Sequence, residues 1–170
     1  LEHSSGFYAG IWASNVDSDF FSGSEMEVDL YAGYGGEFAG GVGYDVGYLA
    51  YRYPKTDYNP NNTEELYGSL SYDFGPAAAT LGLAYSSDFF GGGDSTYTYR
   101  DVDVPLGSDF SLGLHYGATD VDDYGKYDDW KICLGKSFGG FDFALDYTDT
   151  NVNDDDLADD KIIFTISKSL

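Results

Sequence analysis

Alternation of apolar and polar residues with a period of two dominates the chain. In residues 26–34 the even positions are apolar, while the odd positions include Glu27 and Asp29. Residues 110–118, 141–148 and 162–166 repeat this alternation. Successive side chains of a β-strand point to opposite faces, so each stretch predicts a strand with one apolar and one polar face. Similar stripes predict further strands, which gives ten in all; they lie at residues 5–15, 41–53, 63–74, 77–87, 96–104 and 127–138.

The lengths of the strands and of their connections point to one architecture. Strands of about nine to thirteen residues exceed the usual five or six and match a tilted strand that crosses a membrane. The connections alternate between short, at 35–40, 75–76, 106–108 and 139–140, and long, at 16–24, 54–62, 88–95, 120–126 and 151–160. Outer-membrane barrels have short turns on one side and long loops on the other. The sequence therefore predicts an all-β fold, a single antiparallel up-and-down β-barrel over residues 1–170 with long acidic loops.

The polar face of the predicted strands is acidic. In a membrane barrel the apolar stripe meets lipid and the charged residues line the interior. The predicted lumen-lining residues are Glu27, Asp29, Asp45, Glu65, Asp101, Asp142, Asp146 and Lys131. Many Gly, Ala and Ser residues on the same face suit a narrow lumen. An alternative is that these carboxylates pair with Arg52, Arg100 and Lys131 and plug the barrel, because about ten strands leave little free space.

Composition excludes several classes of protein. The chain has 8 Lys and Arg against 30 Asp and Glu, a net charge of −22, which argues against nucleic acid as a partner. Aromatic residues make up 18% of the chain, far more than in a disordered acidic protein. The single cysteine, Cys133, excludes an intrachain disulfide and a multi-cysteine metal site. We expect amphipathic rings near strand ends to form interfacial girdles, with Trp12, Tyr34, Tyr53 and Trp130 as candidates.

No motif in the chain indicates catalysis. The acidic run at 153–160 lacks the glycine, the glutamate and the helices of a calcium-binding EF-hand, so a solvated loop is favoured. Weak divalent binding at Asp154, Asp155 and Asp156 is the metal chemistry left open. His115 is the only interior histidine candidate, and no nucleophile elbow is present. We therefore predict no enzyme, no cofactor and an unreactive Cys133.

Several motifs together resemble the TorF family of porins of Gram-negative bacteria. They lie at residues 6–15 (GFYAGIWASN), 27–34 (EVDLYAGY), 44–48 (YDVGY) and 51–54 (YRYP), with further matches at 65–68, 85–90, 129–130 and 167–169. The resemblance implies an outer-membrane β-barrel without enzymatic activity. Family members usually begin with a further strand pair, of which only residues 1–3 correspond here. The barrel then closes with ten strands, or the other strands are cleaved, disordered or supplied by another chain. Leu170 also differs from the terminal aromatic residue common in outer-membrane barrels.

Two functions of different classes follow from these patterns. The first is passive diffusion of small solutes through a narrow channel in the bacterial outer membrane, with cations favoured by the acidic lumen. The second is a structural role, as a self-assembling barrel subunit of a cell-surface or extracellular fibre without transport. The expected partners are outer-membrane lipid and, in the second case, other copies of the chain through an open strand edge.

Overall fold

The chain forms ten β-strands that follow one another in a meander. The computed structural model describes residues 1–57, 62–153 and 158–168. The strands are β1 (Phe7–Asn15), β2 (Met26–Glu37), β3 (Val42–Arg52), β4 (Thr63–Asp73), β5 (Ala78–Ser86), β6 (Ser95–Gly107), β7 (Phe110–Val121), β8 (Gly125–Phe138), β9 (Phe141–Thr150) and β10 (Lys161–Ser167). All ten predicted strands are present, because alternation of this length is a local property that the backbone follows directly.

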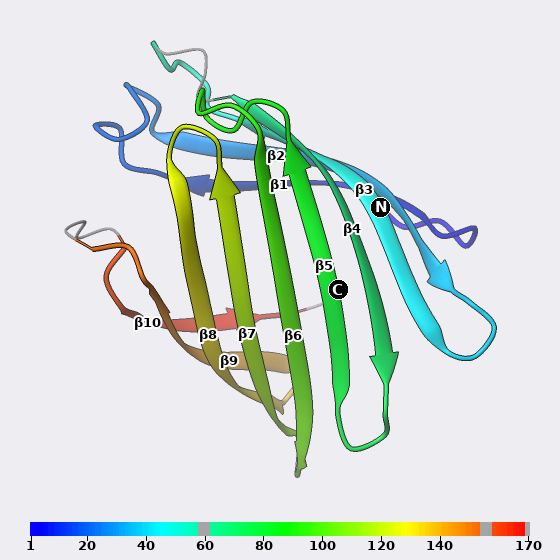
Figure 1. Cartoon of the computed structure of the whole chain (residues 1–170). Helices are drawn as coiled ribbons and strands as arrows, with labels where there is room; N and C mark the ends of the chain where they lie inside the picture. The colour runs from blue at the N-terminus through cyan, green and yellow to red at the C-terminus, as the bar shows by residue number, and fades with distance from the viewer. Residues whose placement is uncertain (58–61, 154–157, 169–170) are drawn as a thin grey trace. The chain divides into compact units, whose positions relative to one another are not determined.

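The strands belong to one up-and-down antiparallel sheet in the order β1 to β10 (Figure 1). Among the described residues no hydrogen-bonded ladder joins β1 to β10, so the sheet is not closed by hydrogen bonds. The predicted up-and-down antiparallel order of strands is therefore present, whereas closure of the barrel by hydrogen bonds is not observed among the described residues. No helix in the described parts of the chain is long and apolar enough to cross a membrane.

The connection between β7 and β8 differs from the prediction. A long loop was expected at 120–126, but β7 continues to Val121 and β8 begins at Gly125, which leaves residues 122–124 between them. Gly125 has a positive φ of 83°, a backbone conformation that glycine adopts without steric strain. This glycine allows the chain to reverse direction within a short turn, so residues 120, 121, 125 and 126 of the expected loop belong to the two strands instead.

The chain divides into two compact units. Unit 1 contains Leu1–Leu70, Gly82–Tyr97 and Asp120–Gly125. Unit 2 contains Ser71–Leu81, Thr98–Thr119 and Lys126–Leu170. Each unit is described by itself below.

The strands have two unlike faces. Opposite residues of an antiparallel pair share a face, so the register of β1 with β2 and of β2 with β3 puts Ile11, Leu30 and Ala50 on one side. In unit 2, Tyr147 lies opposite both Ile132 and Ile162, and Leu145 lies opposite Phe164. Leu145 and Tyr147 are two residues apart in one strand, so all of these side chains share one side. We call this side the apolar face, and the opposite side, which carries Asp29 in unit 1 and Asp146 in unit 2, the acidic face.

The apolar face is exposed. Ile11 is 72% exposed, Leu66 61% and Phe164 63%. The buried hydrophobic residues of the described chain are few, namely Ala50, Tyr53, Ala84 and Val121. These apolar side chains are therefore not covered within the chain itself. The fold is therefore held by backbone ladders and by contacts on the acidic face rather than by a water-excluded core.

Candidate functional site

The acidic face of unit 1 brings four predicted lumen residues onto one surface. Asp29 on β2 lies opposite Tyr51 on β3, and Asp45 on β3 lies opposite Gly35 on β2. Glu27 is two residues before Asp29 and shares its face. Glu65 on β4 joins them, because the Tyr51 hydroxyl donates a hydrogen bond of 3.3 Å to its Oε2. The period of two in the sequence identified this face correctly, and lining of a lumen by it stays a prediction.

A tyrosine-carboxylate cluster lies near the middle of this surface. The Tyr8 hydroxyl on β1 donates a 2.7 Å hydrogen bond to Asp45 Oδ1. It also lies 2.6 Å from the hydroxyl of Tyr67 on β4. A phenol has a single proton to donate, and that of Tyr8 goes to Asp45, so Tyr67 is the donor to Tyr8. The result is a directed chain of hydrogen bonds from β4 across to β1 and back to β3.

Two glycines make room for these rings. Gly33 and Gly47 are directly paired across β2 and β3. A Cβ atom at Gly33 would clash with the ring of Tyr8, and one at Gly47 would clash with the ring of Tyr67. The hydroxyl end of each ring therefore lies over a glycine, and the two hydroxyls meet above the paired backbones. Sequence reasoning placed many glycines on this face but did not select Tyr8 and Tyr67.

A second cluster lies where the long connections begin. Tyr53 follows β3, is 3% exposed, and stacks on Phe21 with ring centroids 4.3 Å apart. Its hydroxyl donates a hydrogen bond to Glu27 Oε2. Burial, and then this bond to an anionic acceptor, raise the pKa of Tyr53 above its ordinary value. Tyr53 therefore stays a neutral donor to Glu27 well into the alkaline range.

Asp29 has an unsatisfied oxygen. Its Oδ1 is buried and has no hydrogen-bond partner among the described residues. An isolated buried acceptor is unfavourable unless water or a cation satisfies it. Asp29 is therefore held on the acidic face without a compensating donor at this oxygen among the described residues.

The acidic face of unit 2 has a histidine between two carboxylates. His115 Nδ1 lies 2.6 Å from Asp101 Oδ1, and its Nε2 lies 3.1 Å from Asp129 Oδ1. Tyr99 stacks beside the imidazole, with ring centroids 6.1 Å apart. The two ring nitrogens of His115 thus each contact one carboxylate, so the imidazole joins β7 to the strands on either side of it. Asp101 was predicted on this face, and Asp129 is an additional member.

The remaining predicted lumen residues share this face of unit 2. Lys131 on β8 lies opposite Thr148, and Asp146 on β9 lies opposite Cys133. Asp142 lies opposite Ser137 and accepts a 2.5 Å hydrogen bond from its hydroxyl.

The two arginines proposed as partners of the lumen carboxylates lie on the other face. Arg52 is two residues from Ala50 on the apolar face and forms a 2.5 Å ion pair with Glu64. The Arg100 guanidinium lies 5.6 Å from the ring centre of Tyr116. Arg52 is seven residues from Asp45 in one strand, and an odd spacing puts the two side chains on opposite faces. The prediction of a plug that includes Arg52 was therefore wrong, and the spacing itself could have excluded it.

Two of the four predicted interfacial aromatic residues lie elsewhere. Trp12 is opposite Asp29 and so belongs to the acidic face. Tyr53 is buried against Phe21. Tyr34 lies opposite Phe7 and Val46 on the apolar face, and Trp130 is two residues from Ile132 on the same kind of face. Trp12 and Ile11 are adjacent in one strand, so their side chains point to opposite faces and Trp12 cannot belong to an aromatic belt on the apolar face.

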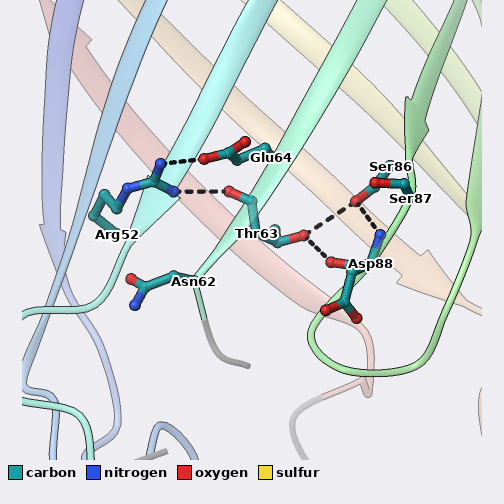
Figure 2. Close-up of a pocket in the computed structure, with 7 residues that line it drawn as sticks. All are labelled: Arg52, Asn62, Thr63, Glu64, Ser86, Ser87 and Asp88. Atoms are coloured by element: carbon teal, nitrogen blue, oxygen red, sulfur yellow. Dashed lines mark hydrogen bonds and ion pairs between the residues drawn. The ribbon is translucent and has the colours of Figure 1, made fainter. Parts of the chain in front are cut away.

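A polar pocket of about 420 Å³ lies at the ends of β3, β4 and β5 (Figure 2). Thr63 and Ser86 are each 2% exposed, and their hydroxyl oxygens are 3.1 Å apart. The Thr63 hydroxyl donates to the Asp88 carbonyl at 2.6 Å. Arg52 Nη1 donates to the Thr63 carbonyl at 3.2 Å. These groups satisfy one another, so the pocket anchors the connection after β5 to β4.

The structure gives no metal-binding group within residues 1–57, 62–153 and 158–168, where no cluster of three or more His, Cys, Asp or Glu is arranged to hold an ion. Asp154, Asp155 and Asp156, for which weak divalent binding was left open, lie outside the described residues.

Comparisons with known proteins agree with this architecture. The profile of a family described as "Bacterial protein of unknown function (Gcw_chp)" matches residues 1–170. A search of curated proteins finds no match. Among solved structures the chain is similar to a porin refined at 1.8 Å resolution, with a TM-score of 0.54 and 15% sequence identity. The similarity covers 96% of this chain and 57% of the porin chain, so this chain spans a little over half of that porin. The shared feature is the fold.

Proposed function

The chain belongs to the Gcw_chp family of bacterial proteins of unknown function, and we propose that it forms a narrow, cation-preferring channel in the outer membrane. The TorF-type porin motifs and the porin-like fold support this role. The observation that carries it is the division of one sheet into an exposed apolar face and an acidic face. An alternating antiparallel sheet in lipid turns its apolar residues to the acyl chains and its polar residues to an aqueous interior.

Cation preference is supported by the partners of the carboxylates. Glu27, Asp45 and Glu65 receive hydrogen bonds from the hydroxyls of tyrosines. These donors are neutral, so they fix the carboxylates in place without cancelling their negative charge. The ion pair Arg52–Glu64 lies on the apolar face and leaves this charge uncompensated. Fixed negative charge in a narrow path raises the local concentration of cations and excludes anions.

The test is the reversal potential of the purified protein in planar bilayers under a potassium chloride gradient. We expect a reversal potential whose sign shows that potassium passes more readily than chloride. Replacement of Asp45→Asn together with Glu65→Gln should move it toward zero. Glu64→Gln, which removes one carboxylate charge from the apolar face, is the control and should leave selectivity unchanged. Anion preference, or inserted protein that does not conduct, would refute the proposal.

Self-assembly without transport is a second candidate, favoured by the edge of β1. Residues 1–3 fold back along this edge, where the Ala9 amide donates to the Leu1 carbonyl at 2.9 Å and the His3 amide donates to the Phe7 carbonyl at 2.8 Å. An open edge that accepts an antiparallel strand can accept one from another copy. Sedimentation without detergent separates the two candidates. Soluble polymers support assembly, and a detergent-dependent monomer supports the channel.

A further inference from the structure

The apolar face of unit 2 carries two lysines at the end of the strands where the short turns lie. Lys136 on β8 is opposite Phe143 on β9, which places it on this face. Its Nζ lies 4.2 Å from the centre of the Phe110 ring and donates to the Ser108 carbonyl. Lys168 follows β10, and its Nζ lies 5.1 Å from the centre of the Phe141 ring. Each ammonium group is thus held over an aromatic ring at the edge of an apolar surface.

The charges on this face are separated along the strands. Asp128 lies near the start of β8, two residues before Trp130, and Asp149 near the end of β9 lies directly opposite Trp130, so both are on the apolar face. Lys136 lies at the other end of β8, beyond Trp130, Ile132 and Leu134. Eight residues of strand cover about 26 Å. At the tilt of a membrane barrel this corresponds to about 20 Å of apolar height, close to the band of such barrels.

This pattern suits a lysine at a membrane boundary. The carbon chain of lysine lies along apolar side chains while the ammonium group reaches the polar headgroup region. The ring below each ammonium stabilises the charge in a partly dehydrated position. β8 and β10 are separated by β9, so the two strands that carry the lysines lie about 10 Å apart. The nearby carboxylates are Asp109 in the β6–β7 turn and Asp142, which lies on the acidic face and is bound by Ser137.

We propose that Lys136 and Lys168 bind the headgroups of anionic phospholipids in the membrane leaflet at the short-turn side. The proposal rests on the membrane-spanning role proposed above. A phosphate that carries a net negative charge complements an exposed ammonium, whereas the phosphate of a zwitterionic headgroup is already compensated by its own cation. Attraction of an anionic lipid surface corresponds to roughly fivefold in affinity for each basic residue near it. The acidic long connections give the opposite leaflet no comparable attraction.

The experiment measures lipid preference in phosphatidylcholine vesicles that contain spin-labelled phosphatidylglycerol or spin-labelled phosphatidylcholine. Electron spin resonance gives the fraction of each lipid immobilised at the protein. We expect the wild type to prefer phosphatidylglycerol several-fold. The variant Lys136→Gln with Lys168→Gln should bind both lipids equally, and Lys136→Arg with Lys168→Arg should retain the preference. About 1 M salt should abolish the preference of the wild type, since the Debye length is then about 3 Å.

The matched control is Lys131→Gln with Lys161→Gln, which removes the same charge from the acidic face. Both lysines lie opposite Thr148 of β9, Lys131 on β8 and Lys161 on β10. It should keep the preference for phosphatidylglycerol. A wild type without preference, or an equal loss in the control, overturns the inference. Insertion into pure phosphatidylcholine, followed as protection from protease, is scored separately. Failure to insert refutes the membrane role itself, whereas insertion without lipid preference refutes only the lysine site.

Discussion

The hydroxyl oxygens of Tyr8 and Tyr67 lie 2.6 Å apart although their strands, β1 and β4, are separated by two others. The rings reach each other because the residues beneath them, Gly33 and Gly47, have no side chains. Tyr8 passes the contact on to Asp45 through a 2.7 Å hydrogen bond. This network ties β1, β3 and β4 together on the acidic face and fixes the position of one of its carboxylates.

Replacement of Gly47→Ala should destabilise the fold by about 1–3 kcal/mol, the usual cost of overpacking. The added Cβ would clash with the Tyr67 ring, which cannot move without losing the hydroxyl contact to Tyr8. Urea unfolding in vesicles, followed by the fluorescence of Trp12 and Trp130, measures the change.

Gly68→Ala is the control for this substitution. The nearest atoms to its added Cβ would be the Asp45 carbonyl oxygen at 3.5 Å and Val46 Cγ1 at 3.6 Å, which is ordinary contact. We expect a change within about 0.5 kcal/mol. Equal destabilisation by both substitutions would show that the packing of Tyr67 over Gly47 is not the cause.

Tyr8→Ala together with Tyr67→Ala should raise the single-channel conductance, because both rings lie over the acidic face and narrow any path along it. Tyr48→Ala, on the apolar face opposite Ala32, is the control and should leave conductance unchanged. Conductance traces in planar bilayers decide the outcome. A folded double variant with unchanged conductance would mean that these rings do not border the path.

The contact of Tyr53 with Glu27 predicts a stability that depends on alkaline pH. The pKa of Tyr53 is raised in the folded state, so its contribution is fully present below the ordinary tyrosine pKa of about 10 and is lost as pH rises through the folded value. Tyr53→Phe removes the donor to Glu27 and should cost about 1–3 kcal/mol at neutral pH.

The difference in unfolding free energy between wild type and Tyr53→Phe, measured from pH 8 to 12, isolates this residue from the other tyrosines. We expect the difference to shrink as pH rises. A difference that stays constant over this range would mean that the Tyr53 proton does not contribute to the contact.

His115→Phe should destabilise the fold by about 1–3 kcal/mol, because Asp101 and Asp129 would each lose the ring nitrogen that they contact on the same face. Asp101→Asn in the His115→Phe background should recover part of the loss by removing one of the two charges. Urea midpoints of the three proteins measure this. No recovery would indicate that repulsion between these carboxylates is negligible.

The sequence by itself determined the strands and their faces. A period of two is a property of single strands, so Glu27, Asp29, Asp45 and Glu65 could be placed on one side without knowledge of any neighbour. The same rule, applied residue by residue, places Arg52 on the apolar face and Trp12 on the acidic face, the reverse of their predicted positions.

Only the tertiary structure decided which residues meet. Register brings Tyr8 to Tyr67 and His115 to two carboxylates, and it depends on pairing between strands that no local pattern encodes. The short β7–β8 turn depends on the backbone conformation of Gly125. Lys136 over Phe110 likewise joins strands whose side chains meet only once the ladders are formed. Local alternation follows from the geometry of one chain, whereas contacts between side chains follow from how the strands align.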